Sequence, residues 1–169
     1  MALDAARFEG FVAQYLGDGV LIYFGYPQAH EDDAERAVRA SLAIVERVRL
    51  LQPRPGVRLE TRIGIATGMV VVEEIGRGTP GAEFSATGET PNLAARLQAV
   101  AGPGQVVLAV ATRQLLGSAF EFAALGRRPM KGVGDAVEVW QVVRARDVPV
   151  RFQSRHPGPE GAIVGRESE

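Results

Sequence analysis

Three side chains of this sequence stand at spacings that suit chemistry on a phosphorylated ligand. The first, Asp18, lies between two short apolar segments, inside the tripeptide Gly17-Asp18-Gly19. If this tripeptide turns a hairpin, the turn carries the carboxylate past the edge of the sheet, where it can bind a hard cation such as Mg²⁺. The dipeptide Asp18-Gly19 also suits an ordinary two-residue turn, because both residues tolerate positive φ, and the dipeptide alone leaves this simpler interpretation open.

Asn92 and Arg96 are the other two candidates. They are four residues apart in a segment that begins with Thr90-Pro91, and proline is common in the first turn of a helix. On a helix the two side chains lie on one face and can reach a single ligand, and a guanidinium suits the geometry of a phosphate. A solvated polar pair on a helix surface is the alternative interpretation.

Hairpins and an amphipathic helix are predicted for the first half of the chain. Apolar residues 11–16 and 20–26 flank the turn described above and predict two antiparallel strands. Apolar residues three and four apart predict a helix over 30–51, with acids at its start and prolines after its end. Alternation over 57–66, followed by a glycine and the apolar run 69–72, predicts a second hairpin.

Helices and strands alternate in the second half of the chain. A loop rich in Gly and Pro is expected at 76–81, followed by a helix that ends near residue 100. Strands are predicted over 106–110, 120–125 and 137–143, with a short helix over 112–116. Helices that interleave with hairpins favour an α+β fold over a purely parallel sheet.

Four segments resemble, in order and spacing, the signatures of class III nucleotidyl cyclase catalytic domains of the bacterial type. They are residues 14–25 (QYLGDGVLIYFG), 62–68 (RIGIATG), 88–96 (GETPNLAAR) and 129–134 (PMKGVG), and the similarity covers about residues 7–143. Several motifs in register are far less common by chance than one glycine pattern. The resemblance implies a ferredoxin-like α+β fold, the formation of a cyclic nucleotide from a nucleoside triphosphate, and active sites shared between two head-to-tail protomers.

The resemblance also implies roles for individual residues. Asp18 would bind Mg²⁺ or Mn²⁺, Asn92 would orient the ribose, and Arg96 would stabilise charge at the α-phosphate. Lys131, the only lysine among the 19 basic residues, matches a family lysine that meets the outer phosphates. A solvated turn lysine is an equally ordinary interpretation of Lys131.

Gln14 and Ser85 occupy the positions from which the family reads the base. Adenylate cyclases commonly carry lysine at the first position and aspartate, threonine or serine at the second. Ser85 fits an adenine reader, whereas the amide of Gln14 can donate to adenine N1 or accept a hydrogen bond from guanine. The expected substrate is therefore ATP, and GTP is the alternative.

The start of the chain departs from the family pattern. Family members carry, ahead of the hairpin, a strand that leads into a phosphate-cradling turn and bears another metal-binding aspartate, whereas residues 1–8 resemble only the end of the helix before the hairpin. We therefore expect a cyclase domain over 1–145 that lacks its first strand and shows little activity alone. Residues 146–169 are polar and are expected to be a linker. Within it, residues 163–169 resemble the opening of an ATPase module that follows the cyclase in some bacterial regulators.

An acidic run at Glu31, Asp32 and Asp33 looks like a metal cluster. It stands, however, in the first turn of a predicted helix, where acids are expected because they interact favourably with the helix dipole. His30 has no second histidine near it and is interpreted as a helix-entry residue.

The composition of the chain argues against several classes of function and partner. The chain has 169 residues, 46% of them apolar, and a net charge of −1, which suits one domain with a substantial core. Without a basic block or a long apolar run, we expect no nucleic acid or membrane partner and a cytoplasmic protein. The absence of cysteine excludes thiolate catalysis. Two hypotheses follow: a homodimeric enzyme domain that makes cyclic AMP from ATP, and a non-catalytic nucleotide-binding or dimerisation module of a larger regulator.

Overall fold

The structure is a computed structural model that describes residues 2–54, 56–75, 83–132 and 134–146. The expected loop at 76–81, and residues 147–169 of the expected linker, lie outside the described residues. Along the chain the elements are α1 (Ala2–Arg7), β1 (Phe11–Leu16), β2 (Gly19–Tyr23), α2 (Asp33–Leu50), β3 (Ile63–Ile65), β4 (Val71–Ile75), β5 (Glu83–Thr87), α3 (Glu89–Val100), β6 (Val106–Ala109), α4 (Val110–Leu115), β7 (Phe120–Arg128) and β8 (Val137–Ala145).

A four-stranded sheet in the order β3-β6-β8-β7 holds the core. β3 runs parallel to β6, whereas β8 is antiparallel to both β6 and β7. Every residue of β6 is buried, and its side chains alternate between two apolar clusters. Val106 and Leu108 pack in the cluster that contains residues of α2, and Val107 and Ala109 pack in the cluster that contains Leu97 of α3. Because successive side chains of a strand point to opposite faces, α2 and α3 cover opposite faces of this sheet.

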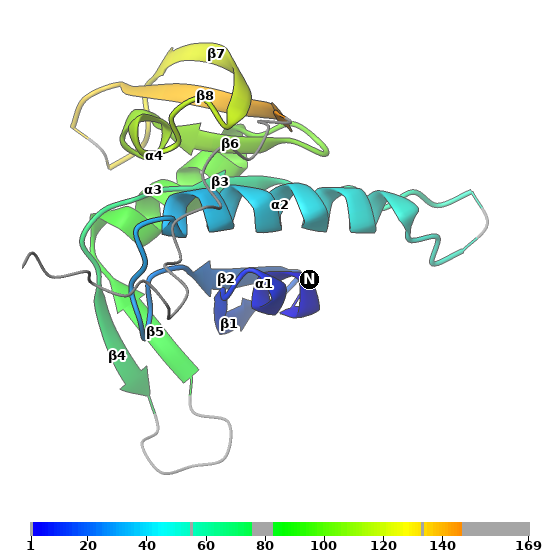
Figure 1. Ribbon diagram of the computed structural model, residues 1–169, viewed down its shortest axis with the longest axis horizontal. Helices are drawn as coiled ribbons and strands as arrows, with labels where there is room; N and C mark the ends of the chain where they lie inside the picture. The colour runs from blue at the N-terminus through cyan, green and yellow to red at the C-terminus, as the bar shows by residue number, and fades with distance from the viewer. Residues whose placement is uncertain (1, 55, 76–82, 133, 147–169) are drawn as a thin grey trace, which may run out of the picture.

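The long helix α2 confirms the predicted helical pattern, although it begins at Asp33 rather than near residue 30. Its buried residues recur three and four apart, as a helix packed along one stripe requires. They are Ala37, Val38, Ala40, Ser41, Ile44, Val45 and Val48. Figure 1 shows α2 lying between the four-stranded sheet and the N-terminal unit made of α1, β1 and β2. α2 therefore joins the two parts of the fold.

The predicted second hairpin, residues 57–66 with 69–72, is wrong. Residues 57–62 form no strand, and β3 pairs in parallel with β6 instead of turning back on the next segment. β4 pairs with β5, a strand that the sequence pattern did not indicate. Gly64 gives the physical reason for the place of β3, because a Cβ at this residue would collide with the backbone of α3 at Ala94 and Gln98. β3 is a short strand held against a helix.

The two hairpins lie away from the four-stranded sheet. β1 pairs with β2 and β4 pairs with β5, each as a separate two-stranded antiparallel sheet. Figure 1 shows the β4–β5 hairpin extending beside β1 and β2, on the far side of α2 from the larger sheet. The hairpin predicted at the Asp18 turn is confirmed.

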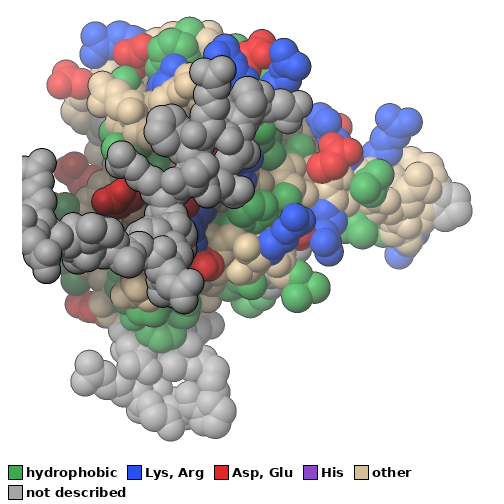
Figure 2. Space-filling model, viewed as in Figure 1, with side chains coloured by type: hydrophobic (Ala, Val, Ile, Leu, Met, Phe, Trp, Pro, Cys, Tyr) green, Lys and Arg blue, Asp and Glu red, His purple; other side chains and the backbone are tan. Residues whose placement is uncertain are grey.

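The surface of the described residues has a mixed character. On the face drawn in Figure 2, basic and acidic side chains interleave, with hydrophobic side chains between them. No helix in the described part of the chain is both long enough and apolar enough to cross a bilayer.

Candidate active site

Asp18 lies at the end of the β1–β2 hairpin. Gly17 and Asp18 form its two-residue turn, and Leu16 pairs with Gly19 below them. The positive φ of this turn, 62°, belongs to Gly17, and neither Asp18 nor Gly19 adopts one. The simpler interpretation, in which Asp18-Gly19 supplies the positive φ angles, is therefore wrong. Asp18 is exposed, and no hydrogen bond or ion pair engages it among the described residues, so its carboxylate is open to a ligand.

Asn92 and Arg96 lie one turn apart on α3, as predicted. The Asn92 Nδ2 atom donates to the Gly88 carbonyl oxygen at 3.2 Å, and Gly88 enters the helix with φ at 131°. This hydrogen bond fixes the plane of the amide and leaves its Oδ1 atom and one N–H available. Asn92 is exposed and Arg96 is half-buried, and both belong to the surface of one helix.

Two close approaches position α3. Gly64 of β3 lets the strand rest on the helix backbone, as described above. Near the start of the helix the Thr90 hydroxyl donates to the Met69 carbonyl oxygen at 3.1 Å, and Gly68 leaves room for that hydroxyl. The two glycines of the 62–68 motif therefore serve packing, and Thr90 of the 88–96 motif ties the helix to the residue that follows them. Sequence reasoning did not assign Thr90 this role, because its partner lies 21 residues away.

Arg96 meets the segment that carries Lys131. An Nη2 atom of Arg96 lies 3.9 Å from the place where a Cβ at Gly132 would be, and Gly132 has a positive φ of 80°. Met130 is buried in the same apolar cluster as Leu97 of α3, which anchors this turn beside the helix. The exposed Lys131 therefore lies between the buried Met130 and Gly132, which is close to Arg96. Two motifs that are about 35 residues apart in the sequence therefore meet beside α3.

A β-bulge decides which way Gln14 faces. The pairing of β1 with β2 shifts between Val12 and Gln14, whose partners are the adjacent residues Ile22 and Leu21. Because adjacent strand residues point to opposite faces, Val12 and Gln14 do so too, although they are two residues apart. Gln14 therefore shares a face with Phe11. Simple alternation would place it on the other face.

The strand of Gln14 lies against the strand of Ser85. The ring of Phe11 meets the ring of Phe84 edge to face, with centroids 4.9 Å apart. Phe84 directly precedes Ser85, which pairs with Glu73 in the β4–β5 hairpin. The two residues expected to read the base thus stand on neighbouring strands.

The candidate residues form two groups. Asp18, Gln14 and Ser85 belong to the hairpins, whereas Asn92, Arg96 and Lys131 belong to α3 and the turn between β7 and β8. No hydrogen bond or ion pair within the described residues joins one group to the other. Two hollows among the described residues have volumes of about 430 and 320 Å³, and Asp18, Gln14, Asn92, Arg96 and Lys131 line neither of them. Both hollows include Arg49, near the C-terminal end of α2.

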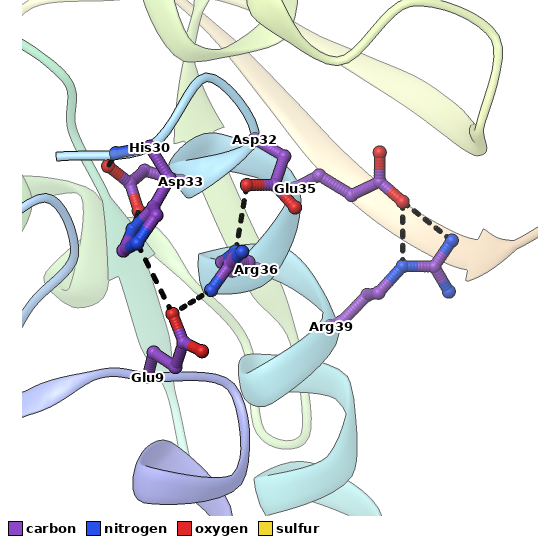
Figure 3. Close-up of polar contacts among 7 residues, drawn as sticks. All are labelled: Glu9, His30, Asp32, Asp33, Glu35, Arg36 and Arg39. Carbon is purple, nitrogen blue, oxygen red and sulfur yellow. Dashed lines mark hydrogen bonds and ion pairs between the residues drawn. The ribbon is translucent and has the colours of Figure 1, made fainter. Parts of the chain in front are cut away.

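The acidic start of α2 is a network of ion pairs (Figure 3). Asp32 accepts from Arg36 Nε at 2.8 Å, and Asp33 accepts from the His30 backbone N–H at 2.7 Å. Arg36 also pairs with Glu9, which precedes β1. The hydrogen bond to Asp32 is the main cause that raises the pKa of Arg36, and Glu9 adds to it. These acids are occupied by partners, and the described residues contain no group of three acidic or histidine side chains suited to a metal ion.

Similarity to known proteins identifies the family. A family model described as the adenylate and guanylate cyclase catalytic domain matches residues 11–144. The chain belongs to the class III nucleotidyl cyclase family. Adenylate cyclase 1 of Rhizobium meliloti (strain 1021) is 33% identical to this cyclase domain over 144 residues, which cover 82% of this chain and 22% of that protein. The receptor-type guanylate cyclase gcy-28 of Caenorhabditis elegans is 26% identical over 138 residues, which cover 79% of this chain and 11% of that protein.

A solved cyclase has the same fold. The adenylyl cyclase CyaB from P. aeruginosa superposes on this cyclase domain with a TM-score of 0.78 at 25% identity, covering 86% of this chain and 78% of that one. The predicted family and the predicted α+β cyclase fold are therefore confirmed, and the chain is a nucleotidyl cyclase catalytic domain. Its relatives include both adenylate and guanylate cyclases. The chain spans less than a quarter of the length of either curated relative.

Proposed function

We propose that this cyclase domain forms cyclic AMP and pyrophosphate from ATP at a site shared by two head-to-tail copies within a longer parent protein, and that the 169-residue chain alone has little activity. The observation that carries the proposal is the approach of Arg96 to the Lys131–Gly132 turn, beside the anchored amide of Asn92. This arrangement places the Arg96 guanidinium beside the turn that carries Lys131, one helical turn from an oriented amide. Such a set of groups suits a ribose and a chain of phosphates.

A divalent cation fits Asp18 as one of its ligands. Mg²⁺ in nucleotide sites is commonly held by one or two carboxylates together with substrate phosphates and water, and the Asp18 carboxylate is exposed and unoccupied by protein partners in the described residues. A bound Mg²⁺ or Mn²⁺ would supply activation of the ribose 3′ hydroxyl and neutralisation of phosphate charge.

The remaining chemistry falls to side chains of α3 and the Lys131 turn. The Arg96 guanidinium would donate hydrogen bonds to the α-phosphate oxygens, where charge grows as the 3′ oxygen attacks and pyrophosphate leaves. The amide of Asn92, held through Gly88, would position the ribose so that the 3′ oxygen lies in line with the leaving group. Lys131 would bind the outer phosphates as a point charge.

The choice of ATP rests on Ser85 and Gln14. Ser85 matches an adenine-reading position of the family, and Gln14 can donate to adenine N1. Gln14 lies on β1 and Ser85 on β5, two strands that are held together by the contact between Phe11 and Phe84, and this supports a joint role of the two residues.

A dimer is favoured by the separation of the two residue groups and by exposed apolar side chains on the hairpins. Tyr15 and Leu16 at the end of β1 are 69% and 53% exposed, and Met69, just before β4, and Val71, its first residue, are 94% and 61% exposed. A second copy that covered these side chains would also bring its own Asn92 and Arg96. In the parent protein we propose a cytoplasmic location and a linker over 146–169 that leads toward an ATPase module.

The second candidate function is a non-catalytic module that keeps the dimeric fold and binds nucleotide. It is favoured by the single metal carboxylate, Asp18, that the motifs assign in this chain, whereas the family pattern carries two metal-binding aspartates. The two candidates differ in whether this chain can supply working residues to an active site.

A complementation experiment separates them. An extended chain would carry, ahead of Met1, the segment that precedes the matched region in the R. meliloti adenylate cyclase 1, together with Asn92→Ala and Arg96→Ala. It should be nearly inactive alone, through loss of ribose positioning and of charge stabilisation at the phosphate. Adding the 169-residue chain should restore cyclic AMP formation, because this chain supplies Asn92 and Arg96 opposite the metal side of the extended chain.

Two variants of the added chain serve as controls. Arg96→Ala in the added chain should abolish the rescue, whereas Asp18→Ala should leave it nearly unchanged, because the working metal site belongs to the extended partner. A folded mixed dimer that restores no activity would show that Asn92 and Arg96 lack these roles, and the non-catalytic module would then be the better description.

A further inference from the structure

A turn at Gly88 leads from β5 into α3, and both of its sides are tied to one short segment that runs into β4. Before the turn, Thr87 pairs with Val71 at the end of the β4–β5 hairpin. After the turn, the Thr90 hydroxyl donates to the Met69 carbonyl oxygen at 3.1 Å. That carbonyl oxygen also lies 3.6 Å from the place where a Cβ at Gly88 would be. The turn is therefore held against this segment from both sides.

Gly88 in turn holds the amide of Asn92. The Gly88 carbonyl oxygen accepts the hydrogen bond from Asn92 Nδ2 at 3.2 Å. Gly88 is the N-cap of α3 with φ at 131°, and within the described residues no side chain of the cap bonds the first turn. A glycine adopts many backbone conformations, so its carbonyl keeps one direction only where its neighbours are fixed. The hydrogen bond from Thr90 to Met69 fixes the neighbouring chain on the helix side.

The place of Arg96 depends on other contacts. Arg96 follows Asn92 by one turn, and the next residue, Leu97, is buried in the apolar cluster that packs α3 on the sheet. The ends of helices open more readily than their packed interiors. Loss of the Thr90 hydrogen bond should therefore loosen the Gly88 turn and the Asn92 amide, and it should leave Arg96 in place.

From these contacts we propose that Thr90 is a positioning residue for the cyclisation, and that it acts through Gly88 on the amide of Asn92. The inference rests on the proposed function, because it assumes that Asn92 orients the ribose. An amide that turns away from the ribose lowers the share of bound ATP whose 3′ oxygen lies in line with the leaving group. The phosphate contacts remain, so the turnover of bound ATP falls while the affinity for ATP is kept.

The test measures kcat and KM for ATP separately in the complementation experiment. The extended chain with Asn92→Ala and Arg96→Ala is saturated with the 169-residue chain, so that Thr90 of the added chain serves the working site. Thr90→Val and Thr90→Ala in the added chain should each lower kcat for cyclic AMP formation by about threefold to tenfold, the range expected for the loss of one hydrogen bond. The KM for ATP should change by less than about twofold, because the phosphate contacts are kept.

Thr90→Ser and Thr67→Val in the added chain are the matched controls. Thr90→Ser keeps the hydroxyl and should keep the wild-type kcat. Thr67→Val removes a hydroxyl close by in the sequence that lies 3.0 Å from the Thr112 hydroxyl of α4, and it should also leave kcat unchanged. An effect seen with Thr90→Val but not with Thr90→Ala would come from crowding of the new methyl group against Gly68, and it would contradict the inference.

A double variant tests whether Thr90 works through Asn92. Asn92→Ala alone in the added chain removes the amide that Thr90 is proposed to hold, and Arg96 remains. Thr90→Val added to Asn92→Ala should lower kcat no further, because both changes remove the same contribution. A second drop, by the factor that Thr90→Val causes in the otherwise wild-type chain, would show that Thr90 acts independently of Asn92 and would overturn the inference.

The outcomes separate this inference from the proposed function. If the wild-type chain restores cyclic AMP formation but Thr90→Val and Thr90→Ala keep its kcat, or raise only the KM for ATP, the positioning role is wrong and the proposed function stands. If the wild-type chain restores no activity, the proposed function fails and the inference fails with it.

Discussion

Some charged side chains of this domain form ion pairs within the protein, and others do not. Asp32 and Arg36 bind each other at the start of α2, so their hydrogen-bonding capacity is largely used within the protein. Asp18 and Arg96 have no such ion-pair partner among the described residues, although each stands at a position defined by a turn or a helix. A charged group that the fold holds in place but leaves unpaired is available to a ligand of opposite charge.

The amide of Gln14 offers a residue-scale test of base selection. Lysine can only donate hydrogen bonds, so Gln14→Lys should match the acceptor at adenine N1 and oppose the protonated N1 of guanine. In the extended chain without other substitutions, the ratio of kcat/KM for ATP to that for GTP should rise by roughly tenfold, as expected when a charged donor replaces a neutral one. An extended chain that prefers GTP, or a ratio that falls on Gln14→Lys, would contradict the adenine assignment.

At the scale of elements, α3 depends on β3 for its place. β3 has only three residues, and its central residue is Gly64. The backbone of Gly64 lies so close to the backbone of α3 that no side chain would fit between them. The buried Leu97 and Met130 then hold α3 against the sheet and the β7–β8 turn. Packing of this helix therefore places Asn92 and Arg96 and also brings the Lys131 turn to them.

Gly64 provides the corresponding prediction. A methyl group at this position would overlap backbone atoms of α3, which cannot move as a side chain can, so Gly64→Ala should lower the free energy of unfolding by about 2–4 kcal/mol. Urea denaturation followed by circular dichroism measures the change. Gly134→Ala is the matched control, because a Cβ there meets no atom within 4 Å, and it should alter stability by no more than about 0.5 kcal/mol. Equal urea midpoints for Gly64→Ala and the wild type would refute the close approach.

For the whole molecule, α2 links the hairpins to the large sheet. One side of α2 packs on the sheet, while α1 packs on α2 with an ion pair between the buried Asp4 and Arg47 at 2.9 Å. At the other end of α1, Glu9 pairs with Arg36 near the start of β1 (Figure 3). The place of the Asp18 hairpin relative to the four-stranded sheet is thus set through α2.

The single hairpin carboxylate leads to a prediction for the purified chain. Incubated with ATP and either Mg²⁺ or Mn²⁺, the 169-residue chain should form little or no cyclic AMP, because the motifs assign only Asp18 to the metal and assistance by metal ions contributes several kcal/mol to phosphoryl transfer. Chromatographic separation of cyclic AMP from ATP measures the product. Sustained turnover by the purified chain, at a rate that Asp18→Ala abolishes, would show that one carboxylate is sufficient.

Local patterns in the sequence determined the Asp18 hairpin, helices α2 and α3 and the presence of a buried strand at β6, because turn chemistry and side-chain periodicity act over a few neighbouring residues. The motifs also identified the family and indicated which residues are candidates for the active site. The tertiary structure alone decided that β3 pairs with β6, that β4 pairs with β5, and that Arg96 meets the Lys131–Gly132 turn. Alternation says which face of a strand is apolar, but it carries no information about which distant strand will cover its edge, and a single bulge reverses the face of Gln14.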